Sequence, residues 1–469
     1  MSRIGGARLA HALHVPRRWR LPNLDAAAVE PVMLLLRDNA RLSTVEMVGI
    51  GNEAALGFAN TLQTHARFYD GLNFNLLRSQ LSVDAAMTLQ RVSKATRLSV
   101  CGIAPEQRHV DLRNMNLQPV DGVLLAADVA FRSSLASLCL AENALGPEGT
   151  RAIAPSIGEN VRAHGALRML DLSCNGIGPD GARAIAAVLR KHPQSLTSLD
   201  LSENELAGID KNGKGTYDIG AIQALMDAVV HSTSLADLNL AENQLCGISA
   251  LGVGTATPGG MGAIADALCQ KSELTRLSLR GNRLNNACSL QLTNGLRRAP
   301  SLTSISLCGC NLSSTAGKAI TDALQQNMGI TFVATANNKL GPASRFISEA
   351  MSHNSTRCMK DADMRQVLEG HFRKNGLEIL SLPVPTRIAP PSSRAATPPG
   401  SSLPSIKGAS APPGGARFFA GAGRADAASA SLKDPSSVQL PSPSKQAAAV
   451  EIVDLGGGGG FMTELPPPQ

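Results

Sequence analysis

Aromatic side chains are scarce in this sequence, which has one Trp, two Tyr and ten Phe among 469 residues. A core must therefore be built from Leu, Ile, Val and Ala, which disfavours a sandwich or barrel, because their strands favour aromatic and β-branched residues. The sequence also lacks an apolar run near the ~18 residues that span a bilayer, which argues against an integral membrane protein. Its nine Cys show no paired spacing, so we expect free thiols in a reducing compartment.

Charge is sparse and has little local order. Charged residues make up 17% of the chain and the net charge is +7, a diffuse excess that does not imply nucleic-acid binding. Residues 1–24 hold five Arg and no acid before Asp25, a pattern typical of an organelle transit peptide or of a basic arm on a cytosolic protein. We favour the arm. From Pro383 onward Pro, Ser, Ala and Gly dominate, so we predict that 384–469 is disordered.

The middle of the chain repeats a leucine pattern. One copy reads Leu135-x-x-Leu138-x-Leu140-x-x-Asn143-x-Leu145, and six further copies follow it. This is the leucine-rich-repeat signature, in which alternating Leu side chains point inward from a short strand. The Asn turns the chain, and its buried amide should bond backbone groups of its own and the neighbouring coil. In one copy Cys310 takes the Asn position as a small buried group.

The spacing of the copies identifies their subtype. Steps between the last strand anchors, from Leu112 to Thr335, are 28, 32, 29, 39, 39, 28 and 28 residues. A base period of 28 leaves room for a helix after each strand, and the Ala/Leu patterns of 181–189 and 263–268 agree with helices. The sequence resembles ribonuclease-inhibitor-type leucine-rich repeats. That group includes the repeats of innate-immune receptors, Ran GTPase activators and axonemal dynein-regulatory leucine-rich subunits. The resemblance implies an α/β solenoid, a horseshoe with concave parallel strands and convex helices.

The same pattern sets the expected domain boundaries. We predict a basic N-terminal arm and cap over 1–39, degenerate repeats over 40–106, regular repeats over 107–345 and a C-terminal cap over 346–383 that includes Leu377, Leu380 and Leu382. Two possible strands, at Leu98-x-Val100 and Val110-x-Leu112, are only 12 residues apart between Val100 and Leu112. That spacing breaks the register, so one of the two should be a hairpin or irregular coil.

Two consecutive repeats carry 11-residue insertions, near 208–218 and 247–260. The first contains Gly208-x4-Gly213-Lys214-Gly215-Thr216, which resembles a phosphate-binding loop, but no companion acidic strand for Mg²⁺ is visible. It also resembles part of a calcium loop, yet Lys214 and Ala221 stand where oxygen ligands are needed. We therefore expect no cofactor and no metal, and interpret the insertions as a contact surface. Since no catalytic motif is present either, we predict that the chain is not an enzyme.

The predicted concave face is the candidate partner-binding site. Its centre is acidic and gives way to two arginines toward the C-terminus. The candidate residues are Glu142, Asp171, Asp200, Glu203, Asp237, Glu242, Arg276 and Arg280. Acidic residues here could recognise a basic patch on a protein partner, or simply keep the face soluble.

We therefore predict a non-catalytic protein-binding scaffold or adaptor, within a multi-subunit complex and without nucleic-acid or membrane partners. The resemblance to axonemal subunits implies a cytoplasmic, cytoskeletal or ciliary location, and import through the basic N-terminus is the alternative. The other function considered is a GTPase activator similar to the Ran activators, with Arg113 as the residue to test as a charge stabiliser. Those activators carry an acidic tail, whereas the tail here is slightly basic.

Overall fold

A computed structural model describes residues 18–37, 42–194, 196–270 and 273–356. The predicted last strand at Leu377–Leu382 and the predicted disordered tail lie outside the described residues, as does the N-terminal segment 1–17. All eight cysteines in the described ranges are free thiols, as expected from their spacing.

The described residues alternate between short strands and helices. The strands are β1 (Arg18–Arg20), β2 (Thr44–Glu46), β3 (Asn73–Asn75), β4 (His109–Asp111), β5 (Ser137–Cys139), β6 (Met169–Asp171), β7 (Ser198–Asp200), β8 (Asp237–Asn239), β9 (Arg276–Ser278), β10 (Ser304–Ser306) and β11 (Phe332–Ala334). The helices are α1 (Ala26–Arg37), α2 (Asn52–His65), α3 (Val83–Thr96), α4 (Pro119–Phe131), α5 (Gly146–His164), α6 (Gly178–Lys191), α7 (Ile219–His231), α8 (Gly259–Gln270), α9 (Asn286–Arg298) and α10 (Ser314–Gln326), with a 3₁₀ turn at Ala66–Phe68 and a further helical stretch at 343–356.

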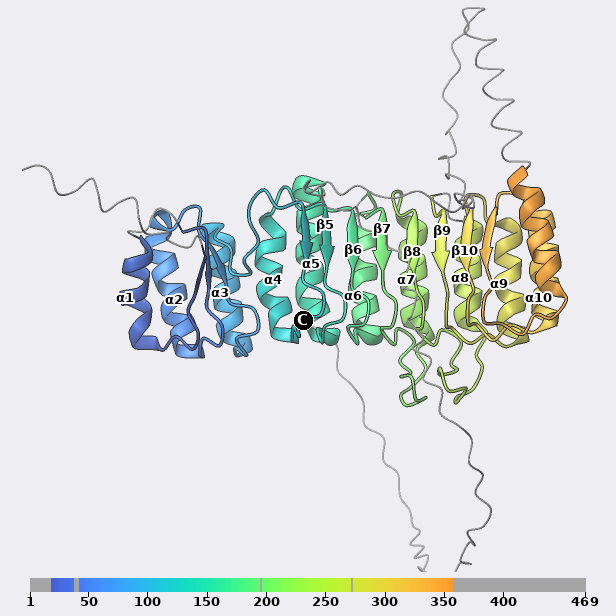
Figure 1. Ribbon diagram of the computed structural model, residues 1–469, viewed down its shortest axis with the longest axis horizontal. Helices are drawn as coiled ribbons and strands as arrows, with labels where there is room; N and C mark the ends of the chain where they lie inside the picture. Colours follow the sequence, from blue (N-terminus) through green and yellow to red (C-terminus); the bar gives the residue numbers. More distant parts are fainter. Residues whose placement is uncertain (1–17, 38–41, 195, 271–272, 357–469) are drawn as a thin grey trace, which may run out of the picture. The chain divides into compact units, whose positions relative to one another are not determined.

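The strands form two parallel sheets, β1-β2-β3 and β4 to β11, each in chain order. In the second sheet every strand pairs in register with the next copy of the repeat, for example Leu170 with Leu199 and Leu199 with Leu238. Each helix packs on the helices before and after it, so Figure 1 shows a row of strands beside a row of helices. This arrangement confirms the predicted α/β leucine-rich-repeat solenoid.

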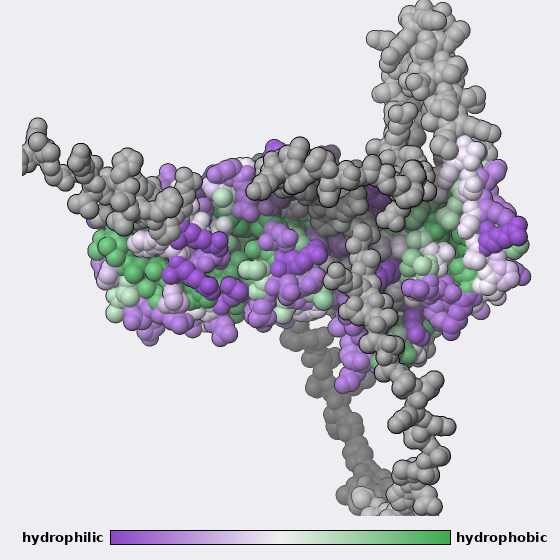
Figure 2. Space-filling view, viewed as in Figure 1, coloured by the Kyte–Doolittle hydropathy of each residue, from purple (hydrophilic) through white to green (hydrophobic). Residues whose placement is uncertain are grey.

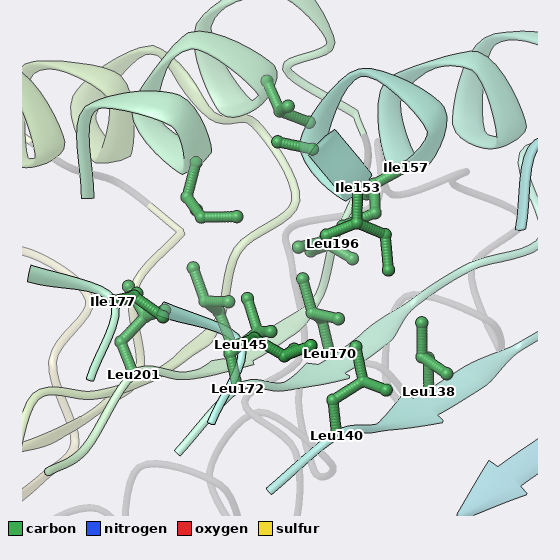
Figure 3. Close-up of a cluster of buried hydrophobic side chains, with 14 of the residues drawn as sticks. Leu138, Leu140, Leu145, Ile153, Ile157, Leu170, Leu172, Ile177, Leu196 and Leu201 are labelled. Carbon is green, nitrogen blue, oxygen red and sulfur yellow. The ribbon is translucent and has the colours of Figure 1, made fainter. Parts of the chain in front are cut away.

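The space between the rows is filled by the leucines of the signature. Leu138 and Leu170 point from their strands toward the helices, and Ile153 and Ile157 of α5 meet them from the other side (Figure 3). These side chains are at most 2% exposed. Because aliphatic chains of similar size recur in every regular repeat, they fill the core beside the second sheet without buried aromatic residues, whereas Phe58, Tyr69 and Phe74 are buried beside the first sheet.

The asparagines connect each coil to its neighbours. Asn243 donates from Nδ2 to the carbonyls of Leu201 and Ala241, both within 3.0 Å, and its Oδ1 accepts the N–H groups of Asn204 and Leu206. Asn143, Asn175, Asn204, Asn282 and Asn338 make corresponding bonds. The predicted bonding of the buried amides is confirmed. Cys310 keeps part of this pattern, since its Sγ contacts the Leu279 carbonyl at 3.2 Å and the Cys308 carbonyl at 3.7 Å.

The two sheets meet at the register break. The irregular segment expected at the break is the first of the two: Ser99 forms only an isolated bridge to Asn73 of β3, while Val110 lies in β4 and starts the second sheet. Among the described residues, no further strand pairs with segment 99–101 at the edge of the first sheet. The N–H groups of Val100 and Cys101 instead bond the carboxylate of Asp128 in α4. Helix α4 thereby supplies acceptors that a neighbouring strand would otherwise provide.

The N-terminal end begins earlier than the repeats expected from residue 40. Strand β1, within the predicted basic arm, pairs in parallel with β2, and Arg18 forms an ion pair with Glu46. Helix α1 follows and packs on α2. Its outer surface is apolar, since Leu35 is 63% exposed, and Figure 2 shows hydrophobic surface at this end.

Candidate functional site

The strand face is the side of the second sheet that carries the predicted site residues, on β4 to β9 and the turns that follow those strands. Asp171 and Asp200 end β6 and β7, whereas Asp237 and Arg276 begin β8 and β9. The remaining predicted residues lie in the turns after the strands.

One turn position has left-handed backbone in every regular repeat. Glu142, Glu203 and Glu242 occupy it with φ between 54° and 57°, whereas Gly281 and Asn114 stand there in other copies. A left-handed conformation costs an ordinary L-residue roughly 1–2 kcal/mol, and Gly or Asn adopt it far more readily. Three repeats therefore carry glutamates on the strand face at a position where glycine would be less strained.

Arginine and lysine side chains reach these carboxylates from neighbouring repeats. Arg113 approaches Asp171 at 3.3 Å and Glu142 at 3.9 Å, and it also contacts the Cys139 sulfur. The hydrogen bond to Cys139 and the nearby carboxylates raise the pKa of Arg113, although partial burial opposes the shift. Arg113 is thus paired within the strand face.

The C-terminal half of the site is paired in the same way. Arg276 forms an ion pair with Asp237, and Arg280 lies 3.8 Å from Glu242. The sequence pattern separated an acidic centre from two arginines, but the structure brings each arginine against an acid of the preceding repeat. The strand face is therefore a network of mixed charge.

Asp200 differs from the other predicted acids. It has no cationic partner among the described residues, and its oxygens accept bonds from Ser202 Oγ at 2.6 Å and Asn239 Nδ2 at 2.8 Å. Burial raises the pKa of Asp200, and the nearby Asp171 adds to this rise, while the bonds from Ser202 and Asn239 oppose it.

The first insertion folds back on its own backbone. Asp210 Oδ1 accepts the N–H groups of Asn212 at 2.9 Å and Lys214 at 2.8 Å, and the Asp210 carbonyl accepts the N–H of Gly213. A phosphate loop needs such N–H groups free to face the ligand. The bond from the Lys214 N–H in particular lowers the pKa of Asp210. This geometry does not fit the phosphate-loop reading of the sequence.

The two insertions are structural twins, which the sequence reasoning missed. Residues 208–218 (loop 1) and 247–257 (loop 2) each close through a bridge, Ile209 to Gly215 and Ile248 to Gly254. Asp210 and Ser249 make the corresponding side-chain bonds within the two loops. The signal was available as Gly-Ile-x-x-x-Gly-x-Gly-Thr, repeated 39 residues apart.

Loop 1 also contacts the strand face. Lys211 Nζ lies 3.0 Å from Glu203 Oε2, so the fourth acid of the predicted set is paired with the insertion. Both loops project from the ends of the strands beside α7 and α8 (Figure 1). The candidate surface therefore combines the strand face with the rim formed by the two loops.

The described residues hold no cluster of three or more side chains suited to a metal ion. Within the same ranges, every helix is too short or too polar to cross a membrane. The strand face offers carboxylates, guanidinium groups and amides.

The comparisons with known proteins agree with the geometry. A family model described as "Leucine Rich repeat" matches residues 167–186 and 192–208. This is a leucine-rich-repeat protein. The helix after each strand makes it one of the ribonuclease-inhibitor type. Leucine-rich-repeat proteins generally act in protein binding, and their fold is typically non-enzymatic. A search of characterised protein sequences found no match.

Several solved structures are similar at low identity. The leucine-rich-repeat-containing protein LegL7 from Legionella pneumophila is 16% identical, with 71% of this chain and 98% of LegL7 covered and a TM-score of 0.36. The tropomodulin C-terminal domain of Caenorhabditis elegans is 15% identical, with 40% and 98% covered and a TM-score of 0.30. A complex of TLR13 with ssRNA13 is 13% identical, with 68% and 41% covered and a TM-score of 0.28. These likenesses are too distant to transfer a partner to this protein.

Proposed function

We propose that this protein is a non-catalytic scaffold that binds a protein partner through the strand face. The observation that carries the proposal is the row of glutamates at left-handed positions. Glu142, Glu203 and Glu242 occupy strained backbone where the other regular repeats carry Gly, Asn or, once, Cys. Strain of this kind tends to collect at functional sites, and here it places charged side chains on an open surface.

The mixed charge of the strand face indicates which charges a partner should carry. Arg113, Arg276 and Arg280 pair with acids across the strand face, so a partner with both acidic and basic side chains can exchange into these pairs. The exposed pair of Arg113 with Glu142 and the half-exposed pair of Arg280 with Glu242 contribute little to stability in water, so their exchange costs little. Electrostatic complementarity of this kind sets specificity and association rate more than raw affinity.

Charge reversal on the strand face tests the proposal. Proximity labelling in the native cell identifies binding proteins, and the purified partner is then measured against Glu203→Lys/Glu242→Lys. We expect at least about tenfold weaker binding, the effect of losing about 1.4 kcal/mol. The matched control is Glu148→Lys/Asp227→Lys, which changes the same charge on α5 and α7. Equal binding by all three proteins contradicts the proposal.

We further propose a cytoplasmic location in a cytoskeletal or axonemal complex. Its support is the sequence resemblance to axonemal leucine-rich subunits. The same labelling experiment tests it, because enrichment of dynein or tubulin agrees with the proposal. Enrichment of organelle-matrix proteins would instead favour import through the basic N-terminus.

A further inference from the structure

Loop 1 and loop 2 are equal in length and backbone bonding but opposite in chemistry at their tips. The positions that carry Asn212 and Lys214 in loop 1 carry Leu251 and Val253 in loop 2. Leu251 is 69% exposed and Val253 is 52% exposed. Large aliphatic side chains at such exposure on a projecting loop have no role in the core, and they mark an interaction site when they are held together.

The loops stack side by side, so their tips form one surface. A Cβ atom placed on Gly213 would lie 2.8 Å from Val253 Cγ1, which means that loop 1 lies directly against Val253. Tyr217, at the end of loop 1, donates its hydroxyl to the Leu245 carbonyl beside loop 2 at 2.8 Å. These contacts hold the tips in place and lower the entropy that binding would cost.

One cation belongs to loop 1 and another lies against loop 2. Lys214 follows Gly213 in loop 1, and Arg283 Nη1 would lie 2.7 Å from a Cβ on Gly252 in loop 2. The salt bridges identified in the described part of the chain include neither Lys214 nor Arg283. The surface is therefore an apolar centre with a cation in or against each loop, and the one acid of loop 1 before Asp218, Asp210, is bonded to the loop backbone.

We propose that the twin loops form a second docking site, for an acidic protein segment that lays an apolar side chain on Leu251 and Val253 and places carboxylates on Lys214 and Arg283. Charge complementarity selects this occupant, because a basic segment would be repelled at both ends of the apolar centre. The site extends beyond the proposed binding by the strand face, since its anchors lie on the loop tips.

A displayed library of random short peptides, selected on the full-length protein, tests the site. We expect selected peptides in which bulky apolar residues neighbour Asp or Glu. Their affinity should fall about tenfold or more for Leu251→Ser/Val253→Ser and for Lys214→Glu/Arg283→Glu. The control Leu290→Ser removes a leucine of 53% exposure from α9, and Lys318→Glu/Arg298→Glu repeats the charge change on α10 and α9. Both controls should bind as the unmodified protein does.

Three outcomes would overturn the proposal. The first is a selection whose peptides are all insensitive to the loop variants, and the second is a selection of basic peptides. The third outcome comes from a binding measurement with vesicles of phosphatidylserine and phosphatidylcholine. If the protein binds these vesicles in a way that depends on Leu251, and no selected peptide depends on the loops, the tips bind a lipid surface. The strand-face variant Glu203→Lys/Glu242→Lys separates the two sites, because failure of the strand-face proposal leaves loop-dependent peptide binding intact.

Discussion

The backbone N–H of Val100 donates a hydrogen bond to the carboxylate of Asp128, 3.1 Å away and 28 residues later in the chain. Asp128 also accepts bonds from Ser99 Oγ and the Cys101 N–H, and it is completely buried. The Asp128 side chain thus accepts hydrogen bonds from the edge of the first sheet, at the point where the repeat register breaks.

Replacing this carboxylate should destabilise the junction of the two sheets. Asp128→Ala leaves the Val100 and Cys101 N–H groups buried without an acceptor, at about 1–3 kcal/mol for each unsatisfied group. We expect a loss of about 3 kcal/mol in the free energy of unfolding, measured by urea denaturation. Asp84→Ala in α3, which removes an exposed carboxylate, is the control, and a loss equal to that control would contradict the assigned role.

The same carboxylate should give stability a pH dependence. Burial raises the pKa of Asp128, while bonds from Ser99, Val100 and Cys101 and the charge of Arg132 oppose the rise. The folded protein therefore binds this proton more tightly than the unfolded chain, whose Asp has a pKa of about 3.9. The contribution to stability is full below that pH and is lost as the pH rises through the folded pKa.

The measurement is the difference in unfolding free energy between the unmodified protein and Asp128→Asn, from pH 3.5 upward in steps of about half a unit around the unfolded pKa. We expect the unmodified protein to lose stability relative to the variant as the pH rises. If the unmodified protein instead gains stability relative to the variant as the pH rises, the folded protein lowers the pKa of Asp128.

Removing the side chain of a buried asparagine should lower the free energy of unfolding by more than its size indicates. Asn243 satisfies the Ala241 carbonyl in its own coil, and one carbonyl and two N–H groups in the preceding coil. Asn243→Ala leaves these groups unpaired, and we expect a loss of about 3 kcal/mol by urea denaturation. Asn294→Ala changes an exposed asparagine of α9, where alanine is the better helix former, so its stability should stay the same or rise. Equal effects of the two variants would argue against the hydrogen-bonded ladder.

Replacing a strained glutamate with glycine should stabilise the fold. Glu142 has φ of 57° and only a long, half-exposed pair with Arg113, so little is lost with its side chain. Relief of roughly 1–2 kcal/mol of left-handed strain exceeds the 0.4–1 kcal/mol that glycine costs through the unfolded chain. We expect Glu142→Gly to gain about 0.5 kcal/mol, whereas Glu148→Gly in α5 should lose about 1 kcal/mol. A loss for Glu142→Gly would mean that its charge contacts outweigh the strain.

Much of the fold could be predicted because the repeat carries its own geometry. The seven copies of the repeat pattern place the strands and the core, and their asparagines place the amide bonds; each strand of the second sheet pairs at the expected register. The break near residue 100 could be seen as a 12-residue spacing, but its resolution depends on Asp128, a helix residue outside the motif. Sequence spacing carries no information about such a tertiary bond.

The candidate site was less predictable for two physical reasons. Long side chains reach across repeats, so Arg276 and Arg280 neutralise acids that the one-dimensional pattern placed apart. The twin loops were hidden because their matching residues are glycines, whose role is conformational, while the chemistry of their tips differs. Comparison of the two insertions at the 39-residue offset would have found them.

The twin loops should depend on Gly215. This residue has φ of 112°, and a Cβ atom there would collide with the Gly208 carbonyl oxygen across the bridge. Gly215→Ala should therefore open loop 1 and expose Lys211 and Lys214 to trypsin, with cleavage sites assigned by mass spectrometry. Gly262→Ala in α8, where a Cβ atom meets no neighbour within 4 Å, is the control and should leave loop 1 as resistant as in the unmodified protein. Cleavage at Lys214 that is equally fast in all three proteins would show that the bridge from Ile209 to Gly215 does not hold loop 1 closed in solution, and the rigid tip surface proposed for the docking site would lose its basis.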